Sequence, residues 1–163
     1  MPAIQPTPIS TPSDLEIEIT RNFDGPRALV TRAFTEPALL QRWMGVFGDW
    51  SWASCDMDVR VGGTYRWVWR QPTGAELALS GTYREVITAE RYVQTQVYEN
   101  MPDFPGEMLA AMTLVDEDGG TRVTQVVRYA SQAERDLDLK YMPNGLEPGF
   151  QALDTLLATE ARA

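Results

Sequence analysis

The stretch 54-SCDMDVRVGGTYRWVWR-70 decides the fold, because apolar and polar side chains alternate on both sides of a glycine pair. The apolar members are Cys55, Met57, Val59 and Val61 before the glycines, and Tyr65, Trp67 and Trp69 after them. An alternation with a period of two is typical of a strand with one buried face. Gly62-Gly63 is typical of a two-residue hairpin turn, so the stretch predicts two paired antiparallel strands.

The same pattern continues on either side of this hairpin. Towards the C-terminus we predict four further strands, over residues 77–87, 92–99, 108–115 and 122–129, so that residues 54–130 hold six strands. Towards the N-terminus, Leu15, Ile17 and Ile19 alternate with polar residues and predict a first strand. The chain between the strands is short and rich in turn-forming residues, which favours antiparallel pairing throughout.

Helical periodicity occurs in two places. Pro26 begins a short helix with apolar residues to Phe34, and Pro37 begins another that ends near Gly45. After the strands, Ser131 caps a predicted helix over residues 131–142, which we expect 142-MPNG-145 to break. An apolar stripe then predicts a terminal helix over residues 146–160.

These elements predict an α+β fold: a seven-stranded curved antiparallel sheet, with two short helices after the first strand and a long C-terminal helix across its concave face. Residues 14–163 form a single domain, and the proline-rich residues 1–13 form an N-terminal tail. No strand–helix alternation occurs, which excludes a doubly wound nucleotide-binding fold.

Composition excludes several functions. The 163 residues include 23 acidic and 14 basic side chains, no histidine and one cysteine, with a net charge of −9. The charge argues against nucleic acid and anionic membranes as partners. Without histidine, and with Cys55 alone, we expect no imidazole base, no metal site and no disulfide, and we expect no cofactor. The single cysteine and the absence of a leader pattern predict a cytoplasmic protein.

Five motifs in order resemble one known family. They are Glu36-Pro37-x-x-Leu40-x-x-Trp43, Asp58-x-Arg60-x-Gly62-Gly63-x-Tyr65, Gly81-x-Tyr83-x-Glu85-Val86, Glu90-Arg91-Tyr92-Val93 and Gly120-Thr121-x-Val123-Thr124. Together they resemble the SRPBCC superfamily of START-like and birch-pollen-allergen-like helix-grip domains. Within it they resemble the branch of homologues of the ATPase activator of the 90-kDa heat-shock chaperone. Gly149-Phe150 stands where that branch usually has Gly-Trp. The resemblance covers residues 14–161 and implies a hydrophobic cavity between sheet and helix.

The aromatic residues are the candidate ligand-binding set. We expect a hydrophobic small molecule of lipid, polyketide or aromatic type to contact Trp43, Tyr65, Trp67, Trp69, Met108, Met112 and Phe150. The pattern alone slightly favours a packed core built from the same residues, whereas the resemblance favours the pocket.

Polar residues on the strands leave two other functions open. Tyr83 and Glu85 are predicted to share one strand face, and Gln94, Gln96 and Tyr98 another. If either face is internal, Glu85, Tyr83 or Tyr98 are candidates for acid–base catalysis in a cyclase or hydratase of this fold. A second alternative is a chaperone-associated interaction domain. We favour a binding protein over an enzyme, and a homodimer stays open.

Overall fold

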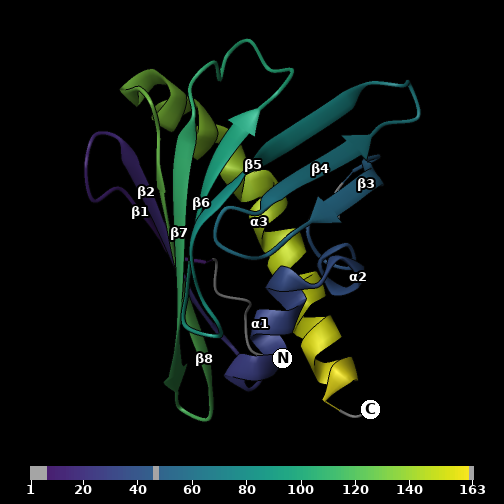
Figure 1. Cartoon of the computed structure of the whole chain (residues 1–163), viewed down its shortest axis with the longest axis vertical. Coiled ribbons are helices and arrows are strands. Elements are labelled where there is room, and N and C mark those ends of the chain that lie inside the picture. Colours follow the sequence, from purple (N-terminus) through teal and green to yellow (C-terminus); the bar gives the residue numbers. More distant parts are fainter. Residues whose placement is uncertain (1–6, 46–47, 162–163) are drawn as a thin grey trace.

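The computed structural model describes residues 7–45 and 48–161. One antiparallel sheet curves around a long helix, with two short helices beside that helix (Figure 1). The elements in chain order are β1 (Ile9–Ser10), β2 (Glu16–Phe23), α1 (Arg27–Thr35), α2 (Pro37–Leu40), β3 (Ser51–Met57), β4 (Thr64–Arg70), β5 (Glu76–Ile87), β6 (Arg91–Tyr98), β7 (Met108–Glu117), β8 (Gly120–Arg128) and α3 (Gln132–Glu160). The α+β class and the helix across the curved sheet are confirmed.

The sheet has eight strands in the order β1-β2-β8-β7-β6-β5-β4-β3. All neighbours pair antiparallel, as predicted, and the six strands between residues 51 and 128 continue the sheet from β2. The prediction of seven strands is wrong by one, because Ile9 and Ser10 of the proline-rich segment pair with β2. Thr7 is buried as well. Residues 1–6 of the predicted tail lie outside the described residues.

Two interruptions of the ladders change which side chains face inward. β5 carries a bulge between Tyr83 and Glu85, so that Tyr83 lies opposite Gln94 whereas Glu85 lies opposite Val93. One extra residue in a strand reverses the face of every residue beyond it. A second bulge falls between Trp52 and Ser54 in β3. The sequence carries a signal of the first shift, because charged Glu85 stands where the alternation calls for an apolar residue and apolar Val86 follows it.

The α3 helix is longer than predicted. It runs unbroken from Gln132 to Glu160, although the sequence predicts a break at residues 142–145. Pro143 and Pro148 both lie inside it. A proline removes one helical hydrogen bond and disfavours the preceding turn, which usually ends a helix. Here apolar side chains on both sides of the prolines pack against the core, including Met142 and Leu146, and this packing keeps the two halves in line.

The core lies between the inner face of the sheet and α3. Its fully buried members come from β2, β7, the short helices and the C-terminal half of α3, and include Ile17, Leu114, Val30, Leu40 and Leu153. The two short helices lie against this half of α3 (Figure 1). Trp43, just after α2, approaches Phe150 of α3 with ring centroids 6.1 Å apart. These contacts fix the C-terminal half of α3 on the sheet.

Candidate ligand-binding site

Six of the seven residues predicted to bind a ligand lie in the packed core. Trp43, Tyr65, Trp67, Trp69, Met108 and Phe150 are all 7% exposed or less. The aromatic rings of β4 contact one another, with centroids 4.6 Å apart for Tyr65 and Trp67 and 6.3 Å apart for Trp67 and Trp69. The structure therefore brings these rings together, in the arrangement that the packed-core alternative describes.

Two of the buried indoles lack hydrogen-bond partners. The Trp43 Nε1 donates to the Ala33 carbonyl at 2.9 Å, whereas the Nε1 atoms of Trp67 and Trp69 have no partner within the described part of the chain. The Trp69 indole instead packs edge-on against Gly45, where an added Cβ would lie 2.2 Å from Nε1. An unpaired buried donor costs free energy. This end of the core therefore keeps two donors that a bound acceptor would satisfy.

The centre of the inner face is less buried than its ends. Along β7 the inward positions are Met108, Ala110, Met112 and Leu114, because alternate residues of a strand share a face. Met108 and Leu114 are each 2% exposed, but Ala110 and Met112 between them are only partly buried. Met112 is thus the one predicted ligand contact that retains exposure.

The strands on both sides of β7 show the same profile. On β8, Val123 and Tyr129 are each 2% exposed, and Gln125 and Val127 between them are only partly buried. On β6, the inward residues after buried Tyr92 are also partly buried. We call these residues the central patch: Gln94, Gln96, Ala110, Met112, Gln125 and Val127. They are neighbours in the sheet, since residue 110 lies opposite both 94 and 127.

The middle of α3 lies between two contacts with opposite ends of the sheet, Asp138 with Tyr129 and Phe150 with Phe23. Leu139, Met142 and Leu146 pack against the core but stay partly exposed, whereas Phe150, Leu153 and Leu157 of the next turns are 3% exposed or less. Helix and sheet thus lose burial at the same place. This profile is the one expected where helix and sheet do not close completely on each other.

One end of the central patch carries an acid and two tyrosines. The Tyr129 hydroxyl, from the β8 end, donates to the Asp138 carboxylate of α3. Tyr98, at the end of β6, lies close enough to Asp138 for the carboxylate charge to add to burial in raising the pKa of the Tyr98 hydroxyl. The Tyr98 ring packs against Phe104, with ring centroids 5.0 Å apart. Burial raises the pKa of Asp138 and of both tyrosines above their usual ranges. All three groups are therefore costly to ionise where they lie.

Of the three catalytic candidates, Tyr98 alone lies at this end of the patch. Tyr83 is 3% exposed and stacks on Tyr65, and burial raises the pKa of its hydroxyl. Glu85 lies on the outer face, half-exposed, with Oε2 3.3 Å from the Arg91 guanidinium. The prediction that Tyr83 and Glu85 share a face is wrong, because the bulge in β5 separates them. Gln94, Gln96 and Tyr98 do share the inner face, as predicted.

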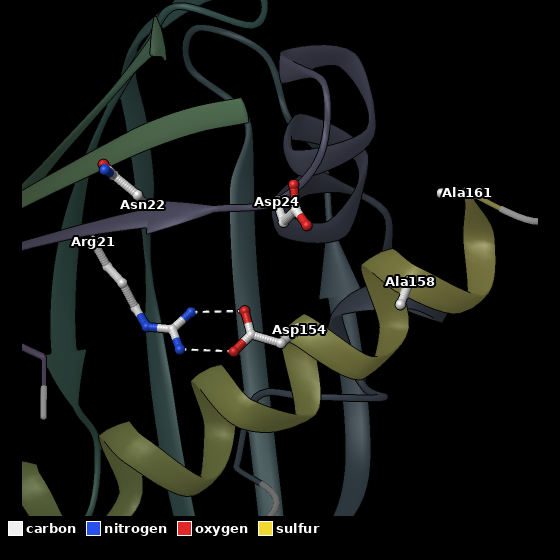
Figure 2. Close-up of a pocket in the computed structure, with 6 residues that line it drawn as sticks. All are labelled: Arg21, Asn22, Asp24, Asp154, Ala158 and Ala161. Carbon is white, nitrogen blue, oxygen red and sulfur yellow. Dashed lines mark hydrogen bonds and ion pairs between the residues drawn. The ribbon is translucent and has the colours of Figure 1, made fainter. Parts of the chain in front are cut away.

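A hollow of about 650 Å³ lies at the rim, between β2 and the end of α3 (Figure 2). Two hydrogen bonds of 2.8 and 2.7 Å join the Arg21 guanidinium to the Asp154 carboxylate across it. The Arg21 guanidinium also lies 4.8 Å from the centre of the Phe23 ring. The Arg21 and Asp154 charges satisfy each other, which leaves Asp24 as the remaining charged residue of the lining. A second hollow, of about 580 Å³, lies over strands β3 to β6 and has charged residues such as Arg66 and Glu99 in its lining.

Across residues 7–45 and 48–161, no three His, Cys, Asp or Glu side chains are grouped so that they could hold a metal ion. Burial raises the pKa of Cys55 to about 11, so its thiol stays protonated at neutral pH. Within the same residues, none of the helices combines the length and the apolar character needed to cross a membrane.

Comparison with known proteins identifies the family. The sequence model described as "Activator of Hsp90 ATPase homolog 1-like protein" matches residues 24–158, most of the chain. The chain belongs to this family. A search of the curated proteins found no match.

Solved structures share the fold of this Hsp90-activator-like domain. A crystal structure from Rhodobacter sphaeroides is 28% identical and covers 95% of this chain and 99% of its own, with a TM-score of 0.87. A second crystal structure, from Nitrosomonas europaea, is 29% identical and has a TM-score of 0.79. The match covers 94% of this chain and 100% of the Nitrosomonas chain. A third crystal structure, from Mycobacterium smegmatis, is 23% identical and has a TM-score of 0.75. The match covers 92% of this chain and 97% of the Mycobacterium chain, and it shows that the fold is shared.

Two residues of this end of the site in the Hsp90-activator-like domain, Asp138 and Tyr129, were not among the residues predicted from the sequence. Asp138 lies one helical turn before Met142, so both fall on one face of α3. An acid on the apolar face of a helix is a signal that could have identified it. Tyr129 follows the predicted alternation of β8, and only the position of α3 reveals its partner.

Proposed function

We propose that this domain binds a hydrophobic small molecule against the central patch, beneath the middle of α3. The supporting observation is the burial profile: inward-facing residues at the centre of β6, β7 and β8 are only partly buried, between fully buried residues on β7 and β8. The family's helix-grip fold supports a ligand-binding or a chaperone-associated domain in general.

The chemistry of the patch favours an apolar ligand with few polar groups. Met112 from the sheet and Met142 from the helix offer flexible thioethers that adapt to rings or short chains. Gln94, Gln96 and Gln125 add amide groups between them. Adjacent strands lie about 4.8 Å apart and alternate residues about 7 Å, so the patch measures about 10 Å by about 7 Å. That footprint suits two fused rings or a short acyl chain.

The chaperone-associated alternative would require a continuous exposed apolar surface. The large exposed apolar residues of the described chain are Val61, Ile87, Leu109, Val115 and Tyr141. Ile87, Leu109 and Val115 each lie opposite an arginine of the neighbouring strand, and this charge interrupts any apolar patch on the outer face. The exposed surface therefore supports this function less well than the inner face supports ligand binding.

The enzyme alternative would now depend on Asp138 and Tyr98 rather than on Glu85. An enclosed carboxylate beside a tyrosine can transfer a proton to a bound molecule. No second carboxylate faces them from the described residues of β6 or β7, where the inward polar residues besides the tyrosines are Gln94 and Gln96. We therefore propose binding without turnover. The cytoplasmic location and the homodimer stay predictions.

Two measurements test the binding proposal. Native mass spectrometry of the purified protein should show a copurified molecule or, after delipidation, a one-to-one complex with N-phenyl-1-naphthylamine, a neutral probe of suitable size. Titration of the probe's fluorescence should then separate two variants of one strand. Met112→Glu, on the inner face, should weaken binding at least tenfold, and Leu109→Glu, on the outer face, should leave it unchanged. Equal affinities in the two variants would place the probe elsewhere.

A further inference from the structure

The Asp138 carboxylate has no cationic partner in the described structure. Its one hydrogen bond comes from the Tyr129 hydroxyl, and no Lys or Arg side chain of residues 7–45 and 48–161 forms an ion pair with it. Arg135, one turn earlier, binds Asp136 and the Ser13 carbonyl instead. A carboxylate that is mostly enclosed by protein is normally paired with a cation.

The side chains that approach Asp138 from the sheet are aromatic. The buried carboxylate of Glu134, one turn earlier on α3, accepts hydrogen bonds from the Gly106 backbone N–H and the Ser131 hydroxyl. Tyr129 reaches it from β8 and Tyr98 lies close on β6, with Phe104 packed on Tyr98. Burial raises the pKa of the Asp138 carboxyl, which is the sign of a charge without compensation. Asp138 nevertheless retains some exposure and shares a helix face with Met142, above the central patch.

One cation of the inner face is already paired with another carboxylate. Arg21 is the inward-facing cation of β2, and its guanidinium is held by both oxygens of Asp154. Glu147 of α3 also acts on it and accepts a hydrogen bond from the Thr7 backbone. Arg21 therefore cannot serve Asp138 without leaving Asp154 unpaired. The inner face therefore carries more carboxylates than cations, and Asp138 is the carboxylate that lies at one end of the central patch.

We propose that the ligand of this site is an organic cation: an apolar molecule with one protonated amine, whose ammonium pairs with Asp138 while its hydrocarbon part covers the central patch. This inference rests on the proposed binding function and names the ligand class. An ammonium supplies the opposite charge that Asp138 lacks, and it forms a charge-assisted hydrogen bond with the carboxylate. A carboxylate ligand would face like-charge repulsion, and a neutral alcohol would gain a hydrogen bond alone.

The experiment compares three probes that share one ring system: 1-naphthylmethylamine, 1-naphthylmethanol and 1-naphthoic acid. Isothermal titration of the full chain at pH 7 should give the amine at least tenfold higher affinity than the alcohol, with the acid weakest. Asp138→Asn should remove this preference and leave the affinity for the alcohol within about threefold. Asp136→Asn, the same change on the exposed side of α3, should preserve it and so excludes general attraction to an acidic protein.

Each outcome decides between the two proposals. Equal affinity for amine and alcohol, or a preference that survives Asp138→Asn, overturns the cation assignment and leaves the binding proposal standing. Failure of all three probes to bind overturns both. If Asp138→Asn does not fold, competition in the wild-type protein decides: the alcohol must displace the amine from a single site, and independent binding of the two overturns the inference.

Discussion

Substituting Ala110 by leucine distinguishes an incompletely filled interior from a packed one. Ala110 is the smallest member of the central patch, at the middle of β7, and is only partly buried. Leucine adds three carbon atoms, worth about 2.4 kcal/mol if they are fully buried at about 0.8 kcal/mol each. Ordering the longer side chain costs about 0.5–1 kcal/mol. Because burial is incomplete, we expect Ala110→Leu to raise the free energy of unfolding by about 1 kcal/mol.

Urea denaturation measures this effect. With a denaturant dependence of about 2 kcal/mol per molar, the midpoint should rise by about 0.5 M. The added side chain occupies space that the ligand needs, so the affinity for N-phenyl-1-naphthylamine should fall at least tenfold. The control is Ala33→Leu in α1, where the alanine is fully buried and overpacking should cost about 1–3 kcal/mol. A similar loss in Ala110→Leu would show that the centre of the inner face is already packed, and would refute the reasoning.

Three further predictions concern individual side chains. Because burial raises the pKa of the Asp138 carboxyl above 3.8, the folded state holds the carboxyl proton more tightly than the unfolded chain does. The free energy of unfolding of the wild type should therefore fall relative to that of Asp138→Asn between pH 4 and pH 7. A constant difference between their urea midpoints over this range would contradict the prediction. In urea or thermal unfolding, Trp43→Phe should lower the free energy of unfolding by about 1 kcal/mol more than Trp67→Phe does, because only the Trp43 substitution also removes a buried hydrogen bond. Equal losses in the two variants would argue against this difference between the two indoles. Glu85→Gln should change stability by less than about 1 kcal/mol and leave probe affinity unaltered, because its ion pair with Arg91 is at the surface; a large loss of binding would return Glu85 to the site.

The sheet was predictable because its strands alternate clearly and its turns are short. The eighth strand was not predictable, because two residues of a proline-rich segment carry no periodicity. The unbroken α3 was missed because local propensity at Pro143 and Pro148 is overridden by packing on both sides.

The candidate site was harder to predict than the fold. Aromatic residues dominate the sequence, but the structure places most of them in the packed core, while smaller residues such as Ala110 and Gln125 line the less buried centre. Alternation identifies a face and does not say how closely a helix covers it. The pairing of Tyr129 with Asp138 depends on where α3 crosses the sheet, which no local pattern encodes.

The central claim is that a hydrophobic molecule binds between the middle of the sheet and the middle of α3, and methionine methyl NMR tests it most directly. Met112 lies in the central patch, Met142 faces it from α3, and Met57 lies on the distant strand β3. Titration of ¹³C-methyl-methionine protein with N-phenyl-1-naphthylamine should shift the Met112 and Met142 resonances together, with one saturating curve, and leave Met57 in place. Saturable binding that moves neither Met112 nor Met142 would contradict the claim.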